Sequence, residues 1–180
     1  MKKKKENTAV LVIDMLNDFL YGKLKCERCQ KIIPSVKRLI REARKSKIPV
    51  IYVCDSHRRN DPEFKKWPPH AVEGTKGAKI IDELKPGKFD FLVRKRRYSG
   101  FFHTDLNLLL RELNIKHVII SGILTNICVQ HTAADAFFLG YKVTIPKETT
   151  EALDDDAKKH ALEFMKEMYG AKIVSLKKLF

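Results

Sequence analysis

Short apolar runs and longer amphipathic segments alternate along the whole chain. Six runs are rich in Val and Ile and nearly continuous in apolar character, as strands buried on both faces are; they are residues 8–14, 49–55, 90–95, 116–122, 142–147 and 171–176. Between them, apolar residues recur at helical spacing in residues 32–46, 77–84, 104–114, 125–140 and 154–170. We expect these five segments to be helices.

This alternation predicts the fold class. Strands that alternate with crossover helices form a largely parallel sheet covered on both faces, so we expect an α/β protein with a three-layer α/β/α sandwich and a mostly parallel, six-stranded, Rossmann-like sheet. Neither an internal repeat nor a linker rich in Pro, Gly or Ser divides the chain. Residues 1–180 are therefore predicted to form a single domain, with a basic tail at residues 1–6.

Composition and charge narrow the class of protein. Apolar residues make up 44% of the chain, and no apolar run approaches the roughly 18 residues of a membrane span, so we expect a cytoplasmic protein without a membrane partner. The net charge of +14 is spread over helix faces with glutamates mixed in. That pattern favours a solvated surface of the kind common in heat-adapted proteins, and it argues against a nucleic-acid partner. A non-catalytic nucleic-acid-binding module is kept as a remote alternative.

The four cysteines are too few for a secreted disulfide scaffold. Cys26 and Cys29 form a CxxC in a basic loop, and this pair is a disulfide, half of a zinc site or two ordinary thiols. We expect a structural role. Cys54 ends a buried strand and is expected to pack there as a small apolar residue.

Polar side chains stand where the predicted strands end. Asp14 follows the first strand, Asp55 the second and Lys95 the third, while the fourth strand leads into Cys128. Each residue alone has an ordinary explanation: a turn cap, a solvated charge or a small buried side chain. Because the carboxyl ends of parallel strands meet at one edge of a sheet, we expect the four to form one site.

Cys128 has the features of a nucleophile. If the helix starts at Thr125, the thiol lies in its first turn, where the helix dipole lowers a thiol pKa. Asp14 can then serve as the base, and Lys95 can stabilise the charge. Backbone N–H groups of residues 122–125 could hold the oxyanion of a tetrahedral intermediate.

Four segments resemble the isochorismatase-like cysteine hydrolases, most closely the nicotinamidases and pyrazinamidases. They are VIDMLNDF, CDSH with WPPHAVEGTKGA, KRRYSGFFHTDL and SGILTNICVQHTAADA. The resemblance implies a catalytic triad of Cys128, Asp14 and Lys95. It also implies a cis peptide bond between Ile123 and Leu124, and an oxyanion hole formed by the N–H groups of Leu124 and Cys128.

The same resemblance implies a divalent metal, expected to be zinc, and an aromatic substrate pocket. The metal ligands would be Asp55, His57, Glu63 and His70, a set of donors that suits zinc. The alternative is that His70 caps a turn and His57 faces solvent. The walls around a flat ring would be formed by Phe19, Trp67 and Tyr98, for which ordinary loop packing is the alternative.

The sequence also departs from the family pattern. Leu16 stands where the family usually has glutamine, and only Arg96 and Arg97 separate Lys95 from Tyr98, where nicotinamidases often have a longer segment. We expect an amidohydrolase that converts nicotinamide to nicotinate and ammonia through a Cys128 thioester. The alternative substrate is an N-carbamoyl or ureido compound. The resemblance further implies a homo-oligomer, a dimer or larger.

Overall fold

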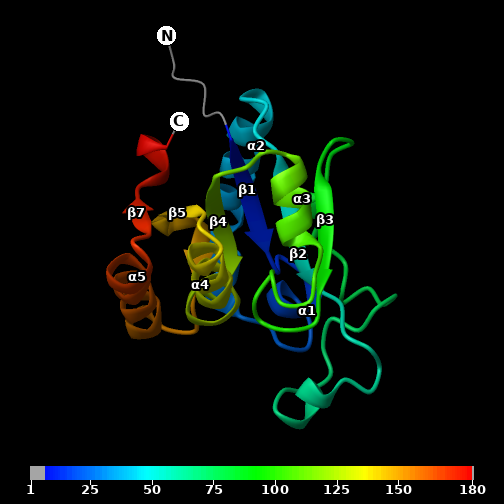
Figure 1. The fold of residues 1–180 in the computed structure, drawn as a ribbon. Coiled ribbons are helices and arrows are strands. Elements are labelled where there is room, and N and C mark those ends of the chain that lie inside the picture. Colours follow the sequence, from blue (N-terminus) through cyan, green and yellow to red (C-terminus); the bar gives the residue numbers. More distant parts are fainter. Residues whose placement is uncertain (1–6, 180) are drawn as a thin grey trace.

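The computed structural model describes residues 7–179, so the predicted basic tail lies outside the described residues. One seven-stranded sheet runs through the molecule in the order β3-β2-β1-β4-β5-β7, with β6 paired to β4, and the paired strands run parallel (Figure 1). The strands are β1 Thr8–Ile13, β2 Val50–Asp55, β3 Phe91–Lys95, β4 His117–Ile123, β5 Lys142–Pro146, β6 Thr150–Glu151 and β7 Lys172–Val174. The predicted fold class is confirmed, and the two-residue β6 is an addition to the six predicted strands.

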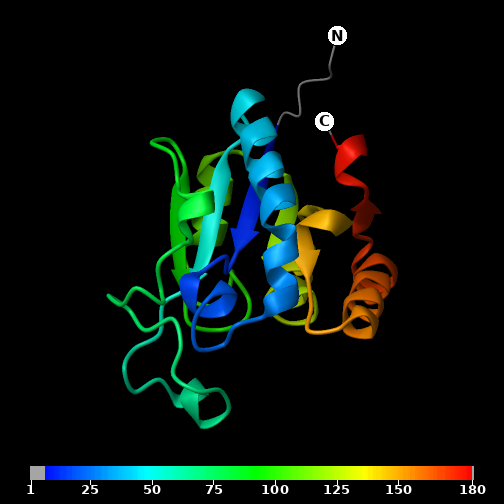
Figure 2. The ribbon, with the colours of Figure 1, turned by 180° about the vertical axis from the view of Figure 1, so that it is seen from behind.

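Helices cover both faces of this sheet. On one face lies α2 (Ile33–Lys45), and on the other lie α3 (Leu106–Glu112), α4 (Gln130–Phe138) and α5 (Asp155–Tyr169), as Figures 1 and 2 show from opposite sides. A short helix, α1 (Asn17–Leu20), follows β1. Within the described residues, no helix combines the length and the apolar character needed to span a membrane.

The alternation of side chains along β1 divides the core in two. All six residues of β1 are buried. Val10 and Val12 pack with the buried side of α2, whereas Leu11 and Ile13 pack with residues of α3, α4 and α5. Successive side chains of a strand point to opposite faces of the sheet, and here each face is covered by helices. A central parallel strand therefore needs apolar residues at every position.

Local sequence signals explain where the long helices begin and end. The side chain of Asp154 accepts a hydrogen bond of 2.7 Å from the N–H of Ala157 and so caps the first turn of α5. Gly170 ends the same helix at φ +61°, a left-handed conformation that glycine adopts at little cost. Pro34 lies in the first turn of α2, where its missing N–H is not needed.

The predicted helix over residues 77–84 is wrong. Residues 77–79 form a turn and a bend, Ile80 forms an isolated antiparallel bridge with Leu16, and Asp82–Leu84 form a 3-10 turn. The backbone of this segment hydrogen-bonds to the chain that leaves β1: the N–H of Asn17 donates to the carbonyl of Lys79 (2.9 Å), and the N–H of Ile81 donates to the carbonyl of Met15 (3.1 Å). Backbone N–H and carbonyl groups that a helix would have bonded within itself therefore bond to a distant segment.

Close contact between β1 and β4 shapes the edge of the sheet at which the candidate site lies. Gly122 has φ +107°, and a Cβ atom there would lie 2.0 Å from the carbonyl oxygen of Ile13. Only glycine lets the two strands approach this closely. The chain of β4 can then turn across the end of β1, next to Asp14.

Candidate active site

The three predicted catalytic side chains meet at the carboxyl edge of the sheet. Asp14 follows β1, Lys95 is the last residue of β3, and Cys128 lies in the turn after β4. The Nζ atom of Lys95 is 2.7 Å from Oδ2 of Asp14 and 3.6 Å from Sγ of Cys128. All three side chains are buried, with Lys95 only 1% exposed.

Asp55 joins this group from β2. Its Oδ1 atom accepts a hydrogen bond of 2.6 Å from the ammonium of Lys95, and its backbone N–H donates one of 2.7 Å to Oδ1 of Asp14. The ammonium therefore lies between two carboxylates. A buried ion group of this kind is stable only when each charge has close partners, which this arrangement supplies.

The environment of Asp14 suits a general base. Burial, together with the nearby Asp55 carboxylate, raises the pKa of Asp14 to about 6, although Lys95 opposes the rise. Asp14 is also held at φ +52°, in the left-handed region that aspartate tolerates better than most residues. A carboxylate with a pKa close to neutrality can both accept and return a proton.

The expected lowering of the Cys128 pKa is not found. Burial raises the pKa of this thiol well above its usual value, and the attraction of Lys95 does not compensate. Cys128 lies in a π-helical turn, Thr125–Val129, that precedes α4. The Thr125 hydroxyl lies 2.8 Å from the hydroxyl of Thr150 and makes no capping hydrogen bond. The raised pKa favours a neutral Cys128 thiol, which would need a base in order to act as a nucleophile.

Leu124 lies at the start of this turn. The peptide bond between Ile123 and Leu124 is cis. The carbonyl of Leu124 accepts hydrogen bonds of 3.1 Å from the N–H groups of Ile127 and Val129. Leu124 and Cys128 both line the same cavity.

A second group of side chains adjoins the first. Donor atoms of Asp55, His57 and His70 all lie within 4.8 Å of one another, and all three residues are buried. The Nε2 atom of His57 is 3.6 Å from Oδ2 of Asp55, the oxygen of that carboxylate not bonded to Lys95. The two imidazole rings have centroids 4.7 Å apart. His57 is completely buried, so it does not face solvent as the alternative held.

The surroundings of both histidines fit a metal site. His70 Nδ1 is 2.7 Å from the carbonyl oxygen of Pro68, and His57 Nδ1 is 3.3 Å from Oδ2 of Asp61. An oxygen partner on Nδ1 keeps the proton there and leaves Nε2 as the ligand atom, which is the usual arrangement behind metal-bound histidine. One carboxylate and two imidazoles are donors that zinc accepts. Glu63 lines the same cavity but lies outside this three-residue group.

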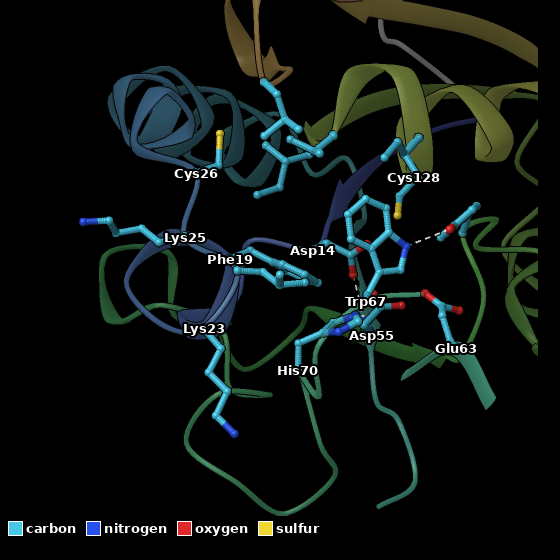
Figure 3. A pocket seen from close by; sticks show the side chains of 16 residues that line it. Asp14, Phe19, Lys23, Lys25, Cys26, Asp55, Glu63, Trp67, His70 and Cys128 are labelled. Atoms are coloured by element: carbon cyan, nitrogen blue, oxygen red, sulfur yellow. Dashed lines mark hydrogen bonds between the residues drawn. The ribbon is translucent and has the colours of Figure 1, made fainter. Parts of the chain in front are cut away.

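A cavity of about 320 Å³ opens in front of the thiol (Figure 3). Phe19, Trp67 and Tyr98 all line it, and the indole Nε1 of Trp67 donates a hydrogen bond of 2.9 Å to the Tyr98 hydroxyl. The Phe19 and His70 rings are 5.4 Å apart. The full lining is Asp14, Phe19, Lys23, Leu24, Lys25, Cys26, Asp55, Glu63, Trp67, His70, Tyr98, Ile123, Leu124, Ile127, Cys128 and Leu153.

Of the three alternatives for the CxxC, the structure shows the disulfide. Cys26 and Cys29 form a disulfide, and their pair opens the 3-10 turn Glu27–Ile32 that leads into α2, so it does not lie in a loop as expected. Cys26 also lines the cavity, which nothing in the sequence indicated. Cys54 is buried in the core, as expected.

Fold and site together define a class: an α/β enzyme with a buried cysteine, aspartate and lysine at the carboxyl ends of its strands. A family model for the isochorismatase domain matches residues 8–178. The chain therefore belongs to the isochorismatase family.

Solved structures of several relatives superpose closely. N-carbamoylsarcosine amidase from Thermoplasma acidophilum is 35% identical with a TM-score of 0.89, covering 94% of this chain and 96% of that one. Nicotinamidase PncA from Bacillus subtilis is 32% identical with a TM-score of 0.89, covering 94% and 99%. Pyrazinamidase of Pyrococcus horikoshii, solved in complex with zinc, has the same identity, TM-score and coverage: 32%, 0.89, 94% and 99%.

Proposed function

We propose that this protein, an amide-hydrolysing enzyme of the isochorismatase family, converts nicotinamide to nicotinate and ammonia. The observation that carries the proposal is the meeting of Asp14, Lys95 and Cys128 at one end of an aromatic cavity. A neutral, flat carboxamide suits walls made by Phe19 and Trp67.

In the first step, Asp14 accepts the proton of the Cys128 thiol as the sulfur attacks the amide carbon. The ammonium of Lys95 lies close to both groups and stabilises the ionised forms of Asp14 and Cys128. The negative charge that develops on the carbonyl oxygen is held by the N–H groups of Leu124 and Cys128. Asp14 then returns the proton to the leaving nitrogen, the C–N bond breaks, and ammonia departs from a thioester.

In the second step, the thioester is hydrolysed. Asp14 takes a proton from water, and the resulting hydroxide adds to the thioester carbon. The carbon–sulfur bond breaks, the sulfur regains the proton from Asp14, and the carboxylic acid product leaves and loses its own proton to water, becoming the carboxylate. The pKa of about 6 lets Asp14 serve as base and acid in turn.

Asp55, His57 and His70 would hold a divalent metal in this enzyme, with zinc as the ion that their donor atoms suit. When bound, such a metal supplies a Lewis-acidic centre that binds and orients the ring nitrogen of a pyridine substrate. The chain's own contribution is to hold donor atoms of His57, His70 and Asp55 close together, with Asp55 and His70 lining the cavity and His57 buried behind them. Glu63 stays a predicted further ligand from the same wall.

One relative favours a second substrate class. The similarity to N-carbamoylsarcosine amidase suggests an N-carbamoyl acid, whose carboxylate would need a cation in the cavity. The cationic side chains that line the cavity are Lys23 and Lys25, and Figure 3 shows both directed away from the space beside Cys128. This orientation supports the neutral carboxamide as the first candidate.

The test is ammonia release by the purified enzyme from nicotinamide and pyrazinamide, compared with N-carbamoylsarcosine and ureidoacrylate. We expect nicotinamide to give the highest kcat/KM. Cys128→Ala should lose at least about 10⁴-fold in kcat while keeping its melting temperature, because the nucleophile is absent and the packing is almost unchanged. Cys54→Ala removes the other buried free thiol and should keep full activity. Turnover retained in Cys128→Ala, or a preference for the carbamoyl compounds, would refute the mechanism or the substrate respectively.

A further inference from the structure

A buried carboxylate in the long loop after β2 has no role in the proposed reaction. Asp61 has a fully buried side chain although it lies in an irregular segment. Its Oδ1 atom accepts hydrogen bonds from Nη1 of Arg97 (3.0 Å) and from the N–H of Glu63 (3.1 Å). Its Oδ2 atom accepts one from Nε of Arg96 (3.1 Å) and lies 3.3 Å from Nδ1 of His57.

His57 is thereby held between two carboxylates. Nδ1 faces Asp61, and Nε2 faces Asp55 at 3.6 Å. The imidazole ring is completely buried and packs edge-on against the rings of Phe64 and His70. A carboxylate beside Nδ1 favours the tautomer with the proton on that nitrogen, so the lone pair of Nε2 points toward Asp55 and His70.

The short link between Lys95 and Tyr98 consists of two arginines, and both of them contact Asp61. Lys95 reaches the catalytic carboxylates, and the next two residues, Arg96 and Arg97, both reach Asp61. Their side chains are 40% and 38% exposed, so as simple surface ion pairs they would add little stability. Two guanidinium groups on one buried carboxylate do, however, fix its position and keep it ionised.

We propose that Asp61 is a positioning residue for the metal site: held by Arg96 and Arg97, it fixes the tautomer and the orientation of the ligand His57. The inference rests on the metal site of the proposed function. It predicts that the affinity for metal depends on a side chain that is not itself a ligand. The alternative is that the ion cluster merely fastens the loop to the end of β3.

The experiment measures metal binding by the full-length protein after removal of metal. Co²⁺ is titrated and followed by its visible absorption, and Zn²⁺ is titrated against a chromophoric chelator. Asp61→Asn keeps the size of the side chain and removes its charge, and we expect its affinity for both ions to fall by about 10- to 100-fold. Asp156→Asn makes the same charge change on the exposed first turn of α5 and should bind within about twofold of the wild type.

A second variant separates positioning from folding. Arg96→Gln with Arg97→Gln leaves Asp61 in place but frees it to turn, so we expect a smaller, several-fold loss of Co²⁺ affinity and a changed absorption spectrum. The melting temperatures of the metal-free proteins show whether each variant folds. If Asp61→Asn does not fold, the double arginine variant still tests the role of Asp61. A merely structural cluster would lower that melting temperature and leave the affinity of the folded fraction unchanged.

The outcomes can be told apart from those for the substrate. Folded Asp61→Asn that binds both ions as tightly as the wild type would overturn the positioning role while nicotinamide hydrolysis stands. A wild-type chain that binds neither ion would overturn the metal site together with this inference. Weakened binding in Asp61→Asn, with no ammonia released from nicotinamide by the wild type, would support the role of Asp61 and refute the substrate.

Discussion

The candidate active site comprises two regions that the chain holds in different ways: the proposed triad of Asp14, Lys95 and Cys128, called the catalytic region, and the proposed metal ligands His57 and His70, called the metal region. In the catalytic region, the backbone of the sheet places the side chains: Asp55 and Lys95 are register partners on β2 and β3, and the N–H of Asp14 donates to the carbonyl of Val53. In the metal region, side chains of the loop hold one another, with His57 against Asp61 and His70 against the carbonyl of Pro68. Asp55 belongs to both regions.

This difference has a consequence for how each region tolerates change. Parallel strands fix their neighbours through a whole ladder of hydrogen bonds, so a single substitution leaves the geometry of the strand ends intact. A loop held by a few side-chain contacts depends on each of them.

The largest effect on stability should come from the buried cation of the catalytic region. Lys95→Met leaves the Asp14 and Asp55 carboxylates facing each other without a counter-charge, which should cost about 3 to 5 kcal/mol in the free energy of unfolding near pH 8. Arg96→Gln removes one cation from the neighbouring, half-exposed position and should cost less than about 1 kcal/mol. Urea unfolding of both variants measures the contrast.

The pH dependence of the Lys95→Met variant checks the cause. Without Lys95, we expect burial and the mutual repulsion of the two carboxylates to raise the folded-state pKa of Asp14 and Asp55 above the unfolded value, so that folding favours their neutral forms. That stabilisation is complete below about pH 4 and is lost as the pH rises through the folded pKa values. The deficit relative to the wild type should therefore shrink between pH 8 and pH 5. A deficit that does not change with pH would contradict the electrostatic explanation.

The same two regions show how far the sequence alone reaches. Asp14, Lys95 and Cys128 could be predicted because each follows a run of apolar residues that is recognisable as a buried strand, and parallel strands bring their ends together. The role proposed for Asp61 could not be predicted in this way. An aspartate before Pro62 is typical of a turn, and its interaction with Arg96 and Arg97 depends on how a long loop folds back on β3.

Two errors have the same origin in distant contacts. Residues 77–84 have helical periodicity, but their backbone pairs with the chain after β1, which a local pattern does not reveal. The pKa of Cys128 was expected to be low from its place near a helix start, whereas burial raises it. The depth of burial depends on the packing of the surrounding elements, so neither error could be corrected from the sequence alone.

The fall of activity at low pH should reflect the protonation of Asp14, the proposed base. The pKa of Asp14 is raised to about 6, so below that pH the carboxyl is protonated and cannot accept the thiol proton. We expect kcat/KM for nicotinamide to fall about tenfold per pH unit below this value. Folding favours the neutral Asp14, so this group's contribution to stability is present below pH 3.8 and lost above about 6.

This profile also sharpens the comparison between the two regions. Asp61→Asn changes the metal region, so it should lower kcat/KM without moving the midpoint of the acid limb. Rates of ammonia release between pH 4.5 and pH 8, under conditions in which the protein stays folded, give both profiles. A wild-type profile that is flat over this range would contradict the assignment of Asp14 as the base.

The smallest effect should come from the hydrogen bond that joins the aromatic walls. Tyr98→Phe removes the hydroxyl that accepts the Trp67 indole N–H at 2.9 Å, a loss of about 1 kcal/mol. Because Trp67 comes from the loop and Tyr98 follows β3, the bond ties the metal region to the catalytic one. A looser wall should weaken substrate binding about fivefold, seen in KM, and leave kcat within twofold because the triad is untouched.

Tyr141→Phe provides the matched control for this variant. It removes a hydroxyl that bonds to Asn107 at 2.8 Å, away from the cavity, and KM should not change. If Tyr98→Phe lowered kcat as strongly as it raised KM, the hydrogen bond between Trp67 and Tyr98 would also affect the geometry of the reacting groups. The catalytic region would then depend on the loop. An unchanged KM would mean instead that Trp67 is held by its packing, and that the loop keeps its place without this link to β3.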